Sequence, residues 1–260
     1  MVPLPPSLRS AFPRPGVSSA LAAHPQKHRK MKVTEQQLFR YQDRCQAGCN
    51  LAKYLESYRR DSDVLVLAVQ KGGVPVAYEV ASALEAELDA LLVRNLSVPG
   101  YEEVEMGAVA RGGVTIRNRD VLKSHLISNV DFTRVKHREF GELFRREFVY
   151  RGERRFPQTE GRSVILVDDG LATTSMLEAA VKAIRRRGAA QVVIAIPVAP
   201  KQIVEQLMDL ANDVICPVIP SHFDGVTPFY REFSEVSDDE ACELLEKQFS
   251  SVRTSECKCL

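Results

Sequence analysis

The sequence predicts an α/β fold, a mainly parallel β-sheet with helices on both faces, and three observations carry this prediction. First, Ser163–Val167, Gln191–Val198 and Val64–Val69 are apolar almost throughout, which is typical of strands buried on both faces. Second, segments of about a dozen residues with helical periodicity alternate with these runs. Third, no apolar run approaches the roughly 20 residues that span a bilayer, so no membrane-spanning fold is expected.

The first elements of the predicted domain are a helix, a strand, a helix and a second strand. Apolar residues recur at helical spacing over residues 38–58. The strand Val64–Val69 follows and ends in Gln70-Lys71-Gly72-Gly73, which we interpret as a glycine-rich loop. Residues 76–87 regain a helical pattern, and the short apolar run Leu88–Val93 predicts the second strand.

A hairpin and a long charged helix are predicted in the middle of the chain. Met106–Ala110 and Val114–Arg117 flank Gly112-Gly113, a pattern typical of a β-hairpin. Asp131–Tyr150 is predicted to be a helix capped by Asp131. Five apolar side chains of this helix are expected to contact the core, namely Phe132, Val135, Leu143, Phe144 and Phe148.

After Gly161 strands and helices alternate again, as a parallel sheet requires. The sequence shows no internal repeat and no convincing second domain, and the segment from Ser234 is acidic and helical in pattern before it becomes polar. The predicted elements are strand Ser163–Val167, helix Thr174–Arg187, strand Gln191–Val198, helix Lys201–Leu210 and strand Val214–Ile219.

The first 34 residues differ in composition from the rest of the chain. They hold six Lys or Arg residues, six prolines and no acid, whereas the whole chain has a formal net charge of +1. We therefore predict a disordered basic leader at 1–34, a single folded domain at 35–245 and a polar tail at 246–260. An Arg-rich, acid-free start is also typical of a transit peptide. Two interpretations stay open: a cytoplasmic protein with an extension, or a plastid or mitochondrial protein with a targeting signal.

Composition limits the classes of partner. A net charge near zero and 27% charged residues favour neither nucleic acid nor a membrane surface as a partner. Six cysteines in 260 residues are too few for a disulfide scaffold. Cys45 and Cys49 share one helical face, where a metal pair or a disulfide is one interpretation; we favour buried or half-buried thiols, because no further ligand lies nearby in the sequence.

The strongest functional motif follows the strand Ser163–Val167. The strand ends in two adjacent carboxylates, Asp168 and Asp169, which repel each other unless a cation or a set of hydroxyl donors takes up their charge. A ribose diol with Mg²⁺ nearby would do so. The amides of residues 172–176, at a helix N-terminus, would hold a phosphate, and hydroxyl groups in the loop would add donors. An Asp-Gly turn followed by a helix cap needs no ligand and stays open as an alternative.

These residues carry a resemblance to a known family. The run from Val164 to Met176 resembles the phosphoribosyl diphosphate (PRPP) signature of type I phosphoribosyltransferases, four apolar residues and two acids before a Thr-Gly-x-Thr loop. The chain from about residue 39 to residue 240 is similar to bacterial-type members of that family. Further matching segments are Lys71-Gly72-Gly73-Val74-Pro75-Val76-Ala77, Leu92-Val93-Arg94, Val98-Pro99-Gly100, Met106-Gly107-Ala108-Val109-Ala110 and Phe229-Tyr230 with Phe233-Ser234.

The resemblance implies a fold, a reaction and a set of site residues. The fold would be a type I phosphoribosyltransferase domain with a small hood. The reaction would transfer ribose 5-phosphate from PRPP to a nucleobase or another nitrogen acceptor, with release of pyrophosphate, in a purine-salvage-like role. Homodimers are common among similar proteins. The implied site residues are Asp168 and Asp169 for the ribose and, through hydroxyls and water, Mg²⁺; Gly170, Leu171, Ala172, Thr173, Thr174 and Ser175 for the 5′-phosphate; and Lys71, Gly72, Gly73 and Arg94 for the pyrophosphate.

The phosphate loop departs from the family pattern. Similar proteins read Ala-Thr-Gly-Ala-Thr-Met where this chain reads Ala172-Thr173-Thr174-Ser175-Met176. A β-branched threonine at the glycine position would be strained where the backbone must approach a phosphate. Two functions therefore stay open: an active transferase, or a PRPP- or nucleotide-binding regulator of the same fold that has lost catalysis.

The resemblance places the acceptor pocket, or hood, between the Asp131–Tyr150 helix and the Ser221–Phe233 segment. Three aromatic side chains in the second segment could stack on a base. At least two of the three are expected to belong to the core instead. They are Phe223, Phe229 and Tyr230.

Overall fold

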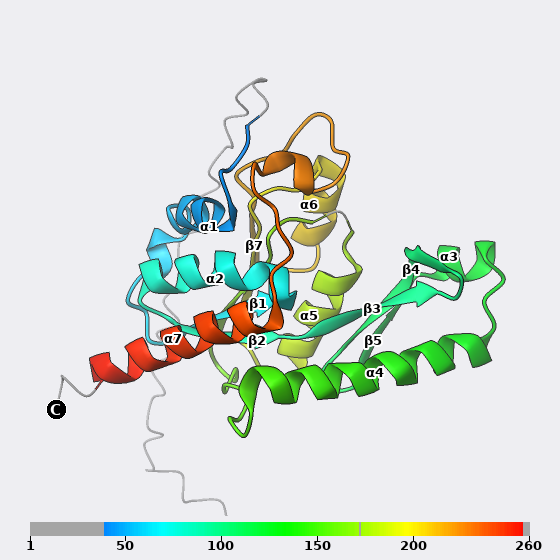
Figure 1. Ribbon diagram of the computed structural model, residues 1–260, viewed down its shortest axis with the longest axis horizontal. Coiled ribbons are helices and arrows are strands. Elements are labelled where there is room, and N and C mark those ends of the chain that lie inside the picture. The colour runs from blue at the N-terminus through cyan, green and yellow to red at the C-terminus, as the bar shows by residue number, and fades with distance from the viewer. Residues whose placement is uncertain (1–38, 172, 257–260) are drawn as a thin grey trace, which may run out of the picture. The chain divides into compact units, whose positions relative to one another are not determined.

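The computed structural model describes residues 39–171 and 173–256 and confirms the predicted fold class. A parallel sheet of five strands has the order β2-β1-β6-β7-β8 (Figure 1). All neighbouring strands in it run parallel, so their carboxyl ends meet at one edge. The strands are β1 (Val64–Val69), β2 (Glu87–Leu91), β6 (Ser163–Val167), β7 (Gln191–Ala195) and β8 (Asp213–Ile215).

Both faces of this sheet are covered, which explains the apolar runs of the sequence. In β1, Val64, Val66 and Ala68 join one core cluster, and the alternate residues Leu65, Leu67 and Val69 join another. The first cluster packs against α1 (Arg44–Ala52), α2 (Gln70–Leu84) and α7 (Asp238–Glu256). The second packs against α5 (Ser175–Arg186) and α6 (Lys201–Met208).

A second, antiparallel sheet of three strands extends the fold. Its strands are β3 (Val93–Val98), β4 (Tyr101–Ala110) and β5 (Val114–Arg117), so the predicted hairpin is confirmed. Gly112 and Gly113 turn it with φ angles of +78° and +74°. The strand β3 was not predicted, because only Leu92 separates it from β2 and the sequence shows one apolar run across both. Helices α3 (Arg119–Ser124) and α4 (Asn129–Arg151) follow this sheet (Figure 1).

Helix α4 corrects two predictions. Its N-cap is Ser128, whose Oγ accepts a hydrogen bond from the amide of Asp131, so Asp131 lies in the first turn and is not the cap. Phe144 and Phe148, expected to contact the core, are 59% and 70% exposed.

The packed face of α4 mixes apolar and charged residues instead. Phe132, Val135 and Leu143 are buried as predicted, and so are Glu139, Glu147 and Arg151. The charges are tolerated because they are paired. Arg151 Nε donates to both Asp89 oxygens at 3.0 and 2.9 Å, and Glu147 accepts from Arg111 at 2.9 Å.

Two elements near the ends of the domain differ from the prediction. The helix expected over 38–58 is shorter and divides into α1 and a 3₁₀ turn, Glu56–Tyr58. The boundary expected at residue 245 falls inside α7, where Gln248 is buried and donates to the Ala86 carbonyl at 3.0 Å. The predicted leader and the last four residues lie outside the described residues. Among the described helices, none is long and apolar enough to cross a membrane.

Candidate active site

The two adjacent aspartates lie directly beyond the carboxyl end of β6. Asp168 is 4% exposed, and its Oδ1 accepts a hydrogen bond from the amide of Asp169 at 2.9 Å. Burial, reinforced by the neighbouring carboxylate, raises the pKa of Asp168 well above its ordinary value. Burial also raises the pKa of Asp169, although the guanidinium of Arg44 opposes the shift. The pair is therefore short of positive charge, which fits a site that receives hydroxyl donors or a hydrated cation.

Arg44 is a site residue that sequence reasoning missed. It is the first residue of α1, and its Nε donates to Asp169 Oδ2 at 2.8 Å with both side chains largely buried. Its Nη1 donates to the Ser234 carbonyl at 2.7 Å, and its guanidinium lies 3.8 Å from the ring centre of Phe233. The arginine thus connects the acid pair to the segment that contains Phe233 and Ser234. No local signal marks it, because its partner lies 125 positions along the chain.

The aromatic residues expected near an acceptor base divide as predicted, with two of them in the core. Phe229 and Tyr230 are buried beside Tyr41. The Tyr230 hydroxyl donates to the Asp169 carbonyl at 2.5 Å, and burial raises the pKa of that hydroxyl. Phe223 is half-buried and stacks on Phe229 with ring centres 5.6 Å apart. The hydrogen bond from Tyr230 therefore holds the backbone of the acid pair in position.

The structure does not bring the two predicted parts of the hood together. The segment 221–233, which contains η2 (Thr227–Phe229), lies with α6 and α1 in Figure 1, whereas α4 runs beneath the antiparallel sheet. Accordingly, α4 packs against β3, β4 and α7. An acceptor pocket formed by both segments is not present in this conformation.

The residues Gln70-Lys71-Gly72-Gly73 form the first turn of α2, where a loop was predicted. Gln70 takes the left-handed φ of +64°, so the chain turns sharply from β1 into the helix. A Cβ on Gly72 would lie 2.6 Å from Asp169 Oδ2, and one on Gly73 would lie 2.8 Å from the Val167 carbonyl. Only glycine permits α2 to begin so close to the acid pair. Lys71 lies in the same turn and is ion-paired with Glu235.

The predicted phosphate loop connects the acid pair to α5. Leu171 is buried, Ala172 lies outside the described residues, and residues 173–176 are half-buried. Thr173 Oγ1 donates to Glu105 Oε2 at 2.8 Å. Thr174 occupies the N-cap position of α5 and makes no side-chain cap hydrogen bond. Ser175 is the first residue of α5, so the predicted position of a helix N-terminus beside Asp168 and Asp169 is confirmed.

Gly170 fixes the start of this loop. Its φ is +149°, and a Cβ would lie 2.5 Å from Val226 Cγ1. We expect G170A to lower the free energy of unfolding by about 2–3 kcal/mol, and Tm by roughly 5–10 °C, because backbone strain and the clash add. Thermal unfolding followed by circular dichroism measures this change.

Two further variants separate the two causes of the expected loss of stability, backbone strain and the steric clash. G225A places a side chain on a residue with φ +105° and no atom within 4 Å of the added carbon, so it isolates backbone strain. G170A/V226A removes the clash and should recover part of the loss. Equal Tm values for G170A and the double variant would contradict the steric explanation.

Arg94 does not lie at the predicted position. It belongs to β3, not to the end of β2, and its Nη2 and Nε donate to Glu139 Oε2 of α4 at 2.7 and 3.0 Å. The ion pair between this guanidinium and the buried Glu139 carboxylate joins β3 to α4. The structure therefore shows Arg94 in a structural pairing with Glu139, and its assignment to the pyrophosphate stays a prediction.

This pairing leads to a testable difference. We expect R94A to destabilise the protein by about 1–2 kcal/mol, because Glu139 keeps only the exposed Arg138 as a partner. The affinity for PRPP, measured by calorimetry, should change less than about threefold. A much weaker affinity with an unchanged Tm would support the pyrophosphate assignment.

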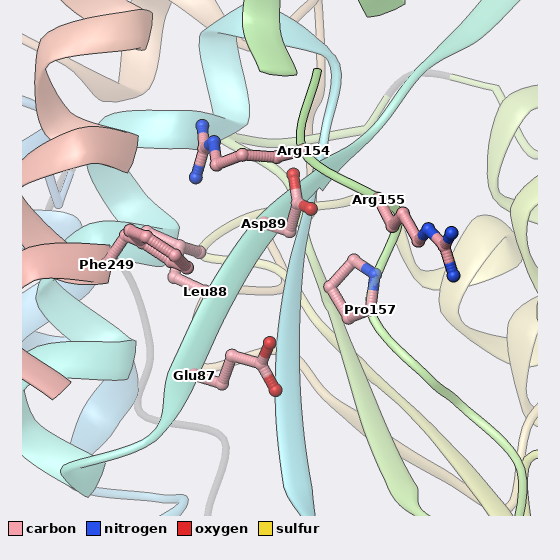
Figure 2. A pocket seen from close by; sticks show the side chains of 7 residues that line it. All are labelled: Glu87, Leu88, Asp89, Arg154, Arg155, Pro157 and Phe249. Carbon is pink, nitrogen blue, oxygen red and sulfur yellow. The ribbon is translucent and has the colours of Figure 1, made fainter. Parts of the chain in front are cut away.

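A separate hollow lies beside the start of β2, away from the edge of the parallel sheet that holds the acid pair. It encloses about 200 Å³ and is lined by β2, the segment after α4 and α7 (Figure 2). Glu87 and Leu88 are the first two residues of β2, so this hollow lies away from the carboxyl edge that holds Asp168. The lining residues are Glu87, Leu88, Asp89, Arg154, Arg155, Pro157 and Phe249.

Taken with the fold, the acid pair and the helix N-terminus that follows define an α/β protein whose candidate site lies at the carboxyl edge of its parallel sheet, the edge where such sheets bind their ligands. Comparison with known proteins is more specific. Residues 40–234 match the model of the phosphoribosyl transferase domain. The chain belongs to the phosphoribosyl transferase family.

Individual relatives agree with this family. A protein of Mycobacterium tuberculosis, provisionally named a phosphoribosyl transferase and found in two strains, is 39% identical over 208 residues, which are 80% of this chain and 46% of the relative. This chain thus spans about half the length of the curated relatives it matches. The crystal structure of TT1426 from Thermus thermophilus is 36% identical, with a TM-score of 0.68 over 81% of this chain and 99% of the other.

Proposed function

We propose that this protein transfers ribose 5-phosphate from PRPP to a nitrogen acceptor and releases pyrophosphate. The observation that carries the proposal is the acid pair, in which Asp168 is buried and Asp169 is largely buried; the pair lies against the glycine turn of α2 and shortly precedes the N-terminus of α5 in the chain. Family membership supports the use of PRPP. The acceptor is a nucleobase or another small nitrogen compound.

The residues present suit the parts of PRPP. The start of α5 offers backbone N–H groups and the hydroxyls of Thr173, Thr174 and Ser175 to the 5′-phosphate. The glycine turn offers close backbone approach and the ammonium of Lys71 to the pyrophosphate. Asp168 and Asp169 accept hydrogen bonds from the ribose hydroxyls between these two ends.

The donor set also suits Mg²⁺ bound through water and substrate hydroxyls. Two buried carboxylates face the single guanidinium of Arg44, so one negative charge in the pair has no cation beside it. Hard oxygen donors of this kind are those that Mg²⁺ prefers, and it keeps several of its waters. When bound, Mg²⁺ would supply charge neutralisation for the departing pyrophosphate. Asp168 and Asp169 would orient the ribose, and Lys71 would stabilise charge on the leaving group.

A second candidate function, a PRPP- or nucleotide-binding regulator without catalysis, is favoured by one specific contact. The Gln70 amide reaches the Met176 sulfur, so side chains link the two loops that would hold the ends of PRPP. Thr174 also stands where similar proteins have glycine. A loop changed in this way could bind a phosphate and still fail to align PRPP for transfer.

One pair of experiments tests both functions. Calorimetry with PRPP and Mg²⁺ should show saturable binding under either function, and the absence of binding would refute both. Pyrophosphate release across a panel of nucleobases and amines then separates them. The proposed transferase releases pyrophosphate with at least one acceptor, whereas the regulator binds PRPP and releases none.

A further inference from the structure

Helices α1 and α2 approach each other closely at Gly48, outside the acid pair. A Cβ on Gly48 would lie 2.6 Å from the Val76 carbonyl oxygen and 2.7 Å from Glu79 Cβ, so only glycine allows this approach. The residues on either side of Gly48 on the same helical face are Cys45 and Cys49. The close approach therefore brings the side chain of Glu79 up to both thiols.

The three side chains form one cluster. Cys45 Sγ donates to Glu79 Oε1 at 3.0 Å, and Cys49 Sγ donates to Glu79 Oε2 at 3.4 Å. One ligand atom from each residue can be chosen so that all three lie within 4.8 Å of one another. Both cysteines are exposed and Glu79 is half-buried, so solvent ions reach the cluster. Over the described parts of the chain, no other group of three His, Cys, Asp or Glu residues meets this condition.

These distances suit a tetrahedral zinc ion. Bonds of about 2.3 Å to sulfur and 2.1 Å to oxygen place sulfur and oxygen ligands about 3.6 Å apart. The observed sulfur–oxygen separations of 3.0 and 3.4 Å would have to open by about 0.6 and 0.2 Å for an ion to enter. Two thiolates select a thiophilic cation over Mg²⁺ or Ca²⁺, which prefer oxygen ligands.

We propose that Cys45, Cys49 and Glu79 form a binding site for Zn²⁺ or a similar thiophilic divalent cation, with the fourth coordination position open to solvent. As the two metal–sulfur bonds form, each thiol gives its proton to solvent. The sequence alone favoured buried or half-buried thiols, because no third ligand was near in the chain. That prediction was wrong: both thiols are exposed, since α1 turns them toward Glu79 at the surface, and the fold supplies the third ligand from α2. The ion would join α1 to α2 one residue away from Arg44, which holds Asp169.

Cobalt titration of the full chain tests the proposal. Cys257 and Cys259 in the C-terminal segment are competing thiols, so the experiment starts from C257S/C259S, kept reduced with a phosphine. We expect one Co²⁺ per chain, with a sulfur-to-cobalt charge-transfer band in the near ultraviolet that Zn²⁺ removes. In this background, C45S or C49S should weaken binding by at least about 100-fold, and E79Q by about 10-fold.

A matched control and a second measurement complete the test. C242S replaces a thiol of α7 that is outside the cluster and should leave the cobalt band unchanged. Zn²⁺ should raise the Tm of the C257S/C259S protein by several degrees, because it binds the folded state, and should not raise that of C45S/C49S. Circular dichroism checks that the metal-free variants are folded. A C257S/C259S protein without the band, or a C45S/C49S variant that keeps it, would overturn the proposal.

Discussion

The variant D168N/D169N is expected to abolish the stabilisation of the protein by PRPP and Mg²⁺ and to reduce pyrophosphate release at least about 100-fold. Asparagine keeps the size of each side chain and removes the charge that the ribose hydroxyls and the hydrated cation would meet. The measurement is the shift in Tm on addition of PRPP with Mg²⁺, together with calorimetry at the same pH. Unchanged PRPP affinity in this variant would refute the role that we assign to the acid pair.

The pH dependence of the stability of D168N/D169N is predicted separately, and it serves as a control for the fold of this variant. Burial raises the pKa of both carboxyl groups above the ordinary value of about 3.9 in the unfolded chain. At pH values between the ordinary pKa and the raised pKa, the folded state binds more protons than the unfolded state. The free energy of unfolding contributed by the pair therefore falls as pH rises through this window. D168N/D169N should lose this part of the pH dependence, so its Tm relative to the unmodified protein should improve with rising pH.

A single substitution distinguishes the two aspartates. D168N removes the more buried carboxyl group and leaves the ion pair between Asp169 and Arg44 intact. We expect it to keep the folded state at neutral pH and to weaken PRPP binding less than the double variant does. If D168N alone lowered Tm by as much as the loss of a buried ion pair would, the role of Asp168 would be to stabilise the fold and not to bind PRPP.

The parallel sheet could be predicted because its strands are buried on both faces. The bounds of β1 and β6 agree with the prediction, since an uninterrupted apolar run has no alternative surface to occupy. Helix α4 was less predictable. Its phenylalanines Phe144 and Phe148 are exposed because paired charges, Glu147 with Arg151 among them, occupy the packed face. Periodicity counts apolar residues and gives no sign of a buried ion pair.

The candidate site could be predicted only where it is local in the sequence. Asp168, Asp169 and the start of α5 are close together along the chain, and the strand-to-helix pattern predicted that they share one site. Arg44 and Tyr230 both reach Asp169 from distant segments, and only the folded chain shows that they do. Arg94 shows the converse: it is close in sequence to a strand end, yet its guanidinium pairs with Glu139 of α4.

Replacement of Arg44 is expected to have the second largest effect. R44A removes the ion pair to Asp169, the hydrogen bond to the Ser234 carbonyl and the contact with the Phe233 ring. We expect it to lower the free energy of unfolding by about 3 kcal/mol and Tm by roughly 6–12 °C, because Asp169 is left buried without a cation. R44K is the matched control. It keeps the charge but not the geometry of the guanidinium, so it should recover part of both losses.

The pH dependence of PRPP binding separates a positioning role for Arg44 from a purely structural one. The guanidinium opposes the rise in the pKa of Asp169, so its removal should raise that pKa further. As pH decreases, PRPP affinity should therefore fall earlier in R44A than in the unmodified protein, and the difference between the two should shrink as pH rises. A purely structural role predicts a lower Tm with the same pH profile as the unmodified protein. Because R44K retains the positive charge, its profile should lie close to that of the unmodified protein even where its Tm does not.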